Sequence, residues 1–307
     1  MKKIGWIKIA ILLIVAGAGF CIIGVLAGFR GGAIYFENWR PAVYAPSLGT
    51  TILALEHAPE TVVINTRSVS VVIEPIPAGE IGDITLLNVE PVEISINDGR
   101  IQIDTTSVER WGMFTLFSFD PNPRGTRREV RLRLSEDADL SNVLVTSTSG
   151  RVQIRGLNAA EIRASSISGS VTINNSHAES LTAISASGSV RGENISWQTL
   201  RAESTSGRVR IDGEIIPSAH RETYLRSASG SVQLTLSNSF GDFGYNLRSR
   251  SGSVRVNGEN RGRGAAAWVD GDDHVVNNDH VVNNDHIVNM NSTSGSVRLE
   301  FVREMGR

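Results

Sequence analysis

Apolar and polar residues alternate over short stretches of this chain, and a Ser-Gly pair interrupts the alternation at regular intervals. In one such stretch Leu200 and Ala202 precede the pair, whereas Val209 and Ile211 follow it. A period of two is typical of β-strands, in which every second side chain points to the same face. The pattern therefore predicts two short strands on either side of a bend.

This stretch occurs seven times with four fixed positions, which are a glycine, the serine before it, a serine three residues before it and a valine two residues after it. The glycines are Gly150, Gly169, Gly188, Gly207, Gly230, Gly252 and Gly295. The serines directly before them are Ser149, Ser168, Ser187, Ser206, Ser229, Ser251 and Ser294. The earlier serines are Ser147, Ser166, Ser185, Ser204, Ser227, Ser249 and Ser292, and the valines are Val152, Val171, Val190, Val209, Val232, Val254 and Val297.

Successive glycines are 19, 19, 19, 23, 22 and 43 residues apart, and a fixed period of this kind is typical of solenoids. We therefore predict an all-β fold, a β-solenoid in which each copy forms one coil of 19–23 residues. Strands of neighbouring coils lie about 4.8 Å apart, so equivalent residues form ladders. We expect the valines to form a buried ladder. We also expect the fourteen serines to point inward and to hydrogen-bond along the stack or to the bend, and the glycines to supply positive φ at the bend.

The repeated serines do not indicate catalysis. A catalytic serine occurs once per site, beside a base and an oxyanion hole, whereas these serines occur in every copy. The sequence also contains no Gly-x-Ser-x-Gly motif, which many serine hydrolases use. We therefore expect these serines to be structural and the protein not to be an enzyme.

The N-terminal segment has the features of a membrane span. Ile9 to Phe29 is a run of 21 uncharged residues, preceded by three lysines and followed by Arg30. A run of this length spans a bilayer as a helix, and the lysines place the N-terminus in the cytoplasm. We predict a cytoplasmic tail at 1–8, one transmembrane helix at 9–29 and an extracytoplasmic remainder. A cleaved signal peptide with a site near Ala16–Ala18 is the alternative, but the apolar run continues beyond it.

The rest of the chain divides by composition. Residues 30–58 contain glycines and prolines without periodicity and predict a linker. Residues 59–140 predict an N-terminal β region with degenerate repeats, and 141–302 the β-solenoid repeat domain. Within that domain, about 257–289 is either an insertion or a degenerate coil that has lost the residues of the motif. An aromatic segment at 107–128 either caps the open end of the solenoid or forms a long hairpin.

Three short Asp-His repeats lie within 257–289, with histidines at His274, His280 and His286. In an extended strand, positions six residues apart are separated by roughly 20 Å, too far for one metal ion. We therefore assign no metal and no cofactor, and interpret the segment as a duplicated loop. The single cysteine, Cys21, excludes a disulfide within the chain.

Arginines occupy outward positions after several of the bends, where they form the candidate ligand-binding residues. These are Arg191, Arg210, Arg255 and Arg298. Like charges one coil apart repel, and a bound anionic envelope polymer would relieve the repulsion. Local ion pairs are the alternative, because acids follow two residues later at Glu193, Asp212 and Glu300. The net charge of −2 does not favour nucleic acid as a partner.

A single N-terminal span followed by the repeated Ser/Thr-x-Ser-Gly-x-Val motif resembles the bacterial putative-adhesin β-strand-repeat proteins, also called toastrack domains. The stretch from Val130 to Leu140, which precedes the first repeat, is similar to the corresponding stretch of the family, and so is the stretch from Val143 to Gly150, which enters that repeat. The resemblance covers roughly residues 60–302. It implies an extracytoplasmic β-solenoid with a role at the cell surface or in envelope stress, and it implies no catalytic residues.

Three functions remain open. The first is a non-enzymatic, membrane-tethered module for cell-envelope binding, adhesion or stress sensing, whose partner is an anionic envelope polymer or a membrane protein. The second is a structural scaffold that assembles end to end, since few residues follow Arg298 to cover the edge of the last coil. The third is a carbohydrate-active enzyme, in which a cluster of carboxylates should interrupt the repeat at one place. The outward positions show no such cluster.

Overall fold

The computed structural model describes residues 33–37, 40–44, 49–89, 92–106, 127–216, 221–239, 244–263, 266–269 and 286–302. These residues form twenty-four strands, and none of them is helical. The chain divides into two compact units, one of residues 1–48 and 109–127 and the other of residues 49–108 and 128–307. In the first unit, β1 (Ala33–Glu37) and β2 (Arg40–Tyr44) form an antiparallel hairpin.

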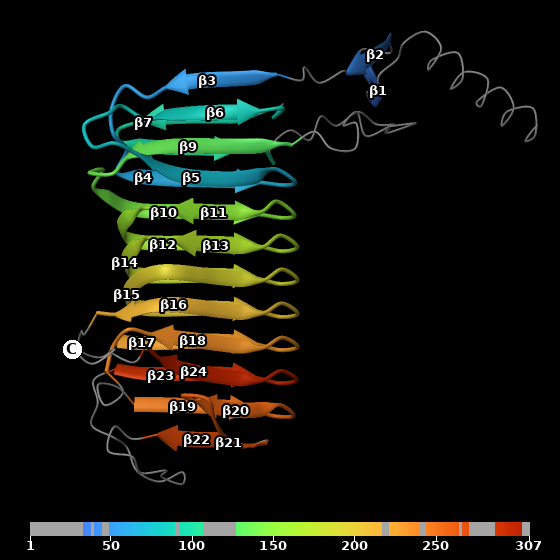
Figure 1. The fold of residues 1–307 in the computed structure, drawn as a ribbon. Helices are drawn as coiled ribbons and strands as arrows, with labels where there is room; N and C mark the ends of the chain where they lie inside the picture. Colours follow the sequence, from blue (N-terminus) through green and yellow to red (C-terminus); the bar gives the residue numbers. More distant parts are fainter. Residues whose placement is uncertain are drawn as a thin grey trace, which may run out of the picture. The chain divides into compact units, whose positions relative to one another are not determined.

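The second unit is a β-solenoid, so the predicted fold class is confirmed for the part of the chain that the structure describes. Each regular coil contributes one strand before the Ser-Gly bend and one after it, and the bends line one edge of the stack (Figure 1). We call the strands before the bends face A and the strands after them face B. Hydrogen bonds join all 22 strands of this unit, since β15 (Val190–Ser204) runs from face B into face A.

The strands of the two faces stack in the same sequence of coils. Face A contains, in stacking order, β7 (Glu93–Asn97), β8 (Arg100–Asp104), β4 (Thr61–Thr66), β10 (Leu140–Ser147), β12 (Asn158–Ser166), β14 (His177–Ser185), the C-terminal part of β15, β17 (Arg221–Ser227), β23 (His286–Ser292), β19 (Gly244–Ser249) and β22 (Ala266–Val269). Face B contains β3 (Thr50–Ala54), β6 (Asp83–Leu87), β9 (Glu129–Ser135), β5 (Ser70–Ile76), β11 (Val152–Arg155), β13 (Val171–Asn174), the N-terminal part of β15, β16 (Val209–Ile215), β18 (Val232–Leu236), β24 (Val297–Phe301), β20 (Ser253–Val256) and β21 (Glu259–Arg263).

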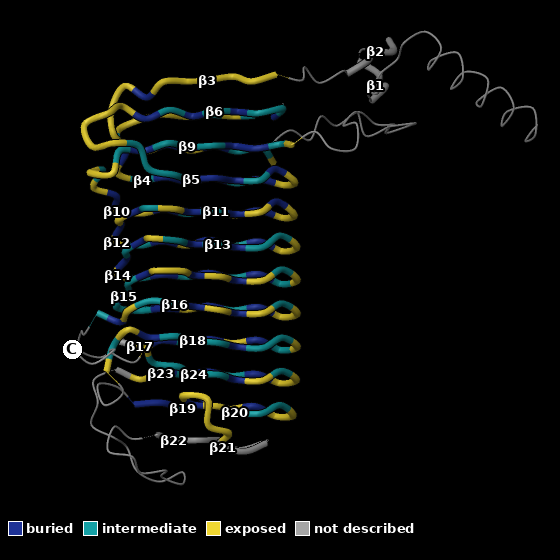
Figure 2. Tube along the Cα trace, viewed as in Figure 1, coloured by how far each residue is buried: buried dark blue, intermediate teal, exposed yellow. Residues whose placement is uncertain are grey.

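The core lies between the two faces (Figure 2). All seven motif valines are buried, with at most 1% of their surface exposed, which confirms the predicted ladder. Trp197, in the coil next to the 23-residue coil, is fully buried. Its indole nitrogen donates to the Thr223 hydroxyl of the next coil at 2.8 Å, so the one polar atom of this side chain is satisfied.

The order of the coils in the stack differs from their order in the sequence. The coil of β23 and β24 is the last in the sequence, yet it lies between the coil of β17 and β18 and the coil of β19 and β20. At the other end, the coil of β8 and β9 lies outside the coil of β4 and β5. The expectation that the C-terminal coil presents a free edge is therefore wrong, since both of its edges are hydrogen-bonded inside the stack.

Antiparallel strands cover both ends of the parallel stack. β21 and β22 pair with the outermost coil at one end, and β6 and β7 do so at the other end, where β3 then pairs with β6. Within residues 257–289, β21 and β22 are therefore antiparallel additions to β20 and β19, whereas the described residues from His286 onward belong to the parallel strand β23. The Asn97–Gly99 turn joins β7 to β8, with positive φ at Asp98 and Gly99.

No helix among the described residues is long and apolar enough to cross a membrane. The predicted transmembrane helix at 9–29 and residues 107–126 of the aromatic segment 107–128 lie outside the described residues.

Candidate functional site

The serine three residues before each glycine forms the same two hydrogen bonds in coil after coil. In the coil of β15 and β16, the Ser204 hydroxyl accepts from the Gly207 N–H at 2.8 Å and donates to the Gly188 carbonyl of the neighbouring coil at 2.9 Å. The other pairs between adjacent motif coils repeat this geometry. All seven serines are buried, as predicted. Six of them each satisfy two backbone groups that face the interior, and Ser147 accepts from the Gly150 N–H at 2.8 Å.

The glycine is needed because the neighbouring coil is close, not because of its φ. A Cβ at Gly207 would lie 2.1 Å from the carbonyl oxygen of Gly188, and one at Gly169 would lie 1.9 Å from that of Gly150. None of the seven motif glycines has positive φ. The expectation of positive φ at this bend is therefore wrong. The opposite bend uses it instead, at Gly156, Asn175 and Asn194.

The serine directly before each glycine does not point inward. All seven are exposed at the edge of the stack: Ser149, Ser168, Ser187, Ser206, Ser229, Ser251 and Ser294. This corrects the expectation that both serines of the motif are internal. Ser251 still donates to the Thr293 carbonyl at 3.0 Å. The exposed serines form a row with one hydroxyl group per coil, about 4.8 Å apart.

The four arginines predicted as ligand-binding residues lie in one ladder on face B. Arg191 and Arg210 are neighbours, and Arg298 and Arg255 are neighbours, with Gln233 between the two pairs. Arg191 lies 3.8 Å from Glu193 and Arg298 lies 3.7 Å from Glu300, as the local-pair alternative predicted. For Arg210 and Asp212 the structure gives no ion pair. Half of this strip is therefore neutralised by its own acids.

A groove crosses face A beside the Ser-Gly edge, and it contains none of these four arginines. Its volume is about 420 Å³, and it extends over the coils of β10, β12, β14, β15 and β17. Two rows of outward side chains line it, one from the strands and one from the bends. The strand row is Thr146, Ser165, Ile184, Glu203 and Arg226, and the bend row is Thr148, Ile167, Ala186, Thr205 and Ala228.

A basic cluster continues these two rows at the C-terminal end of the groove. Arg226 is followed in its ladder by Asn291 and then Arg248, and Arg250 lies beside Thr293 in the bend row, where its N–H donates to the Ser292 carbonyl. None of the three arginines forms an ion pair with another described residue. The cluster was not predicted from the sequence because only the positions after the bends were considered as outward surface. The signal was present, since Arg226 and Arg248 each lie four residues before a motif glycine and Arg250 lies two residues before one.

A model of the family described as Toastrack DUF4097 matches residues 59–277, which is more than half of the chain. The chain belongs to the toastrack family. The resemblance inferred from the repeats and from the approach at Val130–Gly150 is thereby confirmed.

Solved structures similar to this toastrack chain share little sequence with it. A putative cell adhesion protein from Clostridium sporogenes is 13% identical, with 83% of this chain and 99% of that chain covered and a TM-score of 0.36. A putative adhesin from Bacteroides fragilis is 10% identical, with coverage of 84% and 99% and a TM-score of 0.39. A putative lipid binding protein from Parabacteroides distasonis is 12% identical, with coverage of 83% and 97% and a TM-score of 0.39. None of the curated proteins matches.

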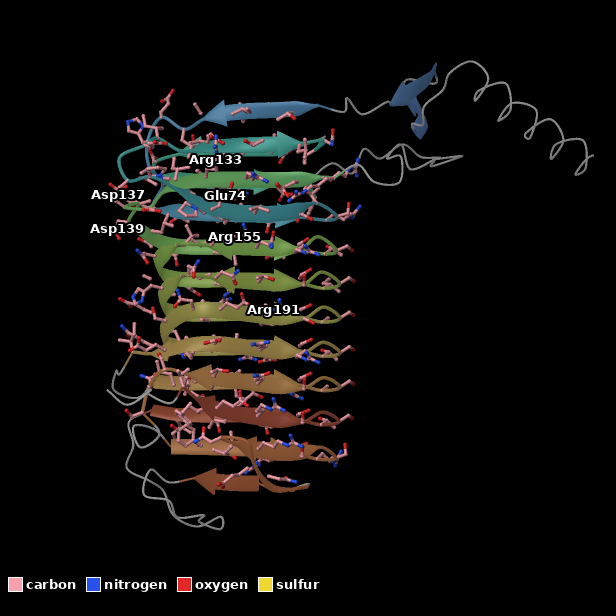
Figure 3. The ribbon with its side chains drawn as sticks, in the orientation of Figure 1. Glu74, Arg133, Asp137, Asp139, Arg155 and Arg191 are labelled. Carbon is pink, nitrogen blue, oxygen red and sulfur yellow. The ribbon has the colours of Figure 1, made fainter. Side chains whose placement is uncertain are left out.

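Charges alternate on face B near the N-terminal end of the toastrack unit, where Figure 3 labels Glu74 and Arg133. Arg133 lies between Glu74 and Asp83 in its ladder and forms an ion pair with Asp83. The hydrogen bond that the Arg133 guanidinium donates to the Asp83 carboxylate raises the pKa of this guanidinium above its ordinary value. The charged side chains of this region are paired with one another along the ladder, so they offer little free charge to an external ligand.

The histidine repeats contribute nothing to the described site. His274 and His280 lie outside the described residues, and His286 is the first residue of β23. No group of three or more potential metal ligands occurs within the described ranges. Metal binding by the histidine repeats involves residues outside the described ranges, so the assignment of no metal and no cofactor stays a prediction.

Proposed function

We propose that this toastrack protein is a non-enzymatic module that binds a component of the bacterial cell envelope, in adhesion or in stress sensing. The groove on face A carries the proposal, because it crosses five coils of a hydrogen-bonded stack and is continued by Arg226, Arg248 and Arg250, which form no ion pair with any residue that the structure describes. A site of this kind requires no movement of the scaffold, since each coil is fixed by its neighbours on both sides.

The tether is part of the same proposal. An uncharged run at 9–29 behind three lysines supports a single span with the N-terminus in the cytoplasm. In that arrangement the solenoid is extracytoplasmic. Protease added to intact spheroplasts should then digest the solenoid, and protection of the solenoid would contradict the tether.

The structure does not favour assembly end to end through the C-terminal coil. That coil lies inside the stack, and antiparallel β21 and β22 pair with the outermost coil instead. Antiparallel strands at an end do not continue the parallel ladder.

The function is tested by co-sedimentation of the full-length protein, held in phosphatidylcholine nanodiscs so that its proposed span is already inserted, with envelope preparations from cells that lack it. We expect the wild type to sediment with the envelope. A variant with Arg191, Arg210, Arg255 and Arg298 all changed to Gln should sediment equally, because half of that strip is already paired with acids. If the wild-type protein stays in the supernatant at low and at physiological salt, the binding function is wrong.

A further inference from the structure

We propose that the groove on face A binds a linear acidic polysaccharide that runs along the stack, with acidic sugars alternating with neutral ones. This inference rests on the proposed binding function and names the ligand class of its site. Three features carry it, namely the mixed lining of the groove, the position of the basic cluster and the direction in which the groove runs.

The lining suits the two kinds of surface that a sugar presents. Thr146, Ser165 and Thr205 offer hydroxyl groups that both donate and accept hydrogen bonds. Between them lie Ile167, which is 58% exposed, and Ile184. A sugar ring has hydroxyl groups at its rim and carbon-bound hydrogens on its faces, so it can contact both kinds of side chain at once.

The direction of the groove excludes an added peptide strand. The groove crosses the strands of face A, whose backbone groups are already used in the ladders between coils. β-Augmentation requires an open strand edge, and the groove has none. A ligand here is therefore held by side chains alone. Over five coils spaced about 4.8 Å apart, the groove is roughly 19 Å long.

The spacing of the arginines in the basic cluster indicates how far apart the negative charges of a matching ligand should lie. Arg226 and Arg248 occupy the same row two coils apart, about 9.6 Å when coils are 4.8 Å apart. This separation is close to the length of a disaccharide in an extended β-linked glycan. Carboxylates on alternate sugars would therefore meet both guanidinium groups, each of which can bind a carboxylate through two N–H donors.

The acids near this cluster are already occupied. Glu203 forms an ion pair with Arg201 at 2.6 Å, and Glu222 accepts from the Asn289 amide at 2.6 Å. They therefore compete little for Arg226 and Arg248. On face B, by contrast, Glu193 and Glu300 contact two of the four arginines directly. Charge complementarity favours face A for an anionic ligand.

The test measures binding of hexasaccharides to the full-length protein in phosphatidylcholine nanodiscs by calorimetry. The probes are a hyaluronan hexasaccharide with acids on alternate sugars, a hexagalacturonate with an acid on every sugar, and neutral cellohexaose. We expect hyaluronan to bind at least about tenfold more tightly than cellohexaose, because each charge-assisted hydrogen bond contributes more than about 1.5 kcal/mol. If hexagalacturonate binds more tightly than hyaluronan, charge alone determines binding and the proposed spacing is wrong.

Matched variants locate the site. Arg226→Gln with Arg248→Gln should weaken hyaluronan binding at least about tenfold, whereas Arg191→Gln with Arg210→Gln on face B should leave it unchanged. Ile167→Glu should weaken it too, since it places a negative charge in the groove. All five positions are exposed, and thermal melts confirm that each variant is folded. Equal losses on both faces would overturn the inference. If the wild type binds no hexasaccharide yet sediments with the envelope, the binding function stands and the ligand class is wrong.

Discussion

Two rows of serines run along the same edge of the solenoid, and they come from the same motif, two residues apart. Ser204, in the inner row, is 4% exposed and bonded to two backbone groups. Ser206, in the outer row, is exposed. The same residue type, repeated with the same period, therefore has two different roles. A repeated residue shows that a position recurs in space, but it does not show which side of the backbone that position faces.

The difference follows from where the strand ends. Ser204 is the last residue of β15, so the alternation of the strand directs its side chain inward. Ser206 lies within the bend, where alternation no longer applies. The inner row links each bend to its neighbour, whereas the outer row is available to solvent and to partners.

We expect the largest loss of stability from a substitution of the motif glycine in the bend. Gly207→Ala would place a Cβ 2.1 Å from a backbone carbonyl oxygen that the stack fixes in position. We expect a loss of about 3 kcal/mol in the free energy of unfolding, from overpacking that cannot relax. Gly244→Ala is the control, because nothing lies within 4 Å of its Cβ position. Urea denaturation measures both, and equal midpoints would show that the coils can separate at the bend.

The second prediction compares the two rows of serines and concerns a loss of stability of intermediate size. Ser204→Ala leaves the Gly207 N–H and the Gly188 carbonyl without their partner, which should cost about 1–3 kcal/mol. Ser206→Ala should change stability by no more than about 0.5 kcal/mol, as is usual for an exposed side chain. Thermal and urea unfolding of the two variants provide the comparison. Equal losses would mean that the outer hydroxyl groups also stabilise the fold.

The third prediction concerns connectivity, and we expect little effect on stability before oxidation. In a Cys21→Ser background, Ser229→Cys with Ser294→Cys should form a disulfide, because the two bends are adjacent in the stack and lie within the Cα separation that a disulfide requires. Ser229→Cys with Ser251→Cys should not, since these bends are two coils apart, about 9.6 Å. Non-reducing electrophoresis after proteolysis distinguishes the pairs. A link only in the second pair would show that the coils stack in sequence order.

The proposed ligand site shows how far the sequence could lead. The outward positions of Arg191, Arg210, Arg255 and Arg298 follow from alternation, and the structure places them in one ladder on face B. Their role in binding stays a prediction. The groove on face A was not predicted, because a hollow depends on the sizes and orientations of side chains from five coils at once.

The sequence by itself determined the coil, since period-two alternation and a 19-residue repeat suffice to specify strands, bends and a buried valine ladder. It also determined the family, because the motif recurs at fixed positions. Only the tertiary structure decided the order of the coils. Hydrogen bonds between stacked strands are made by backbone groups, which are the same in every coil, so the sequence does not specify which coil lies beside which. The final coil could therefore lie between two earlier ones, and that arrangement places Arg226 and Arg248 two coils apart in one row.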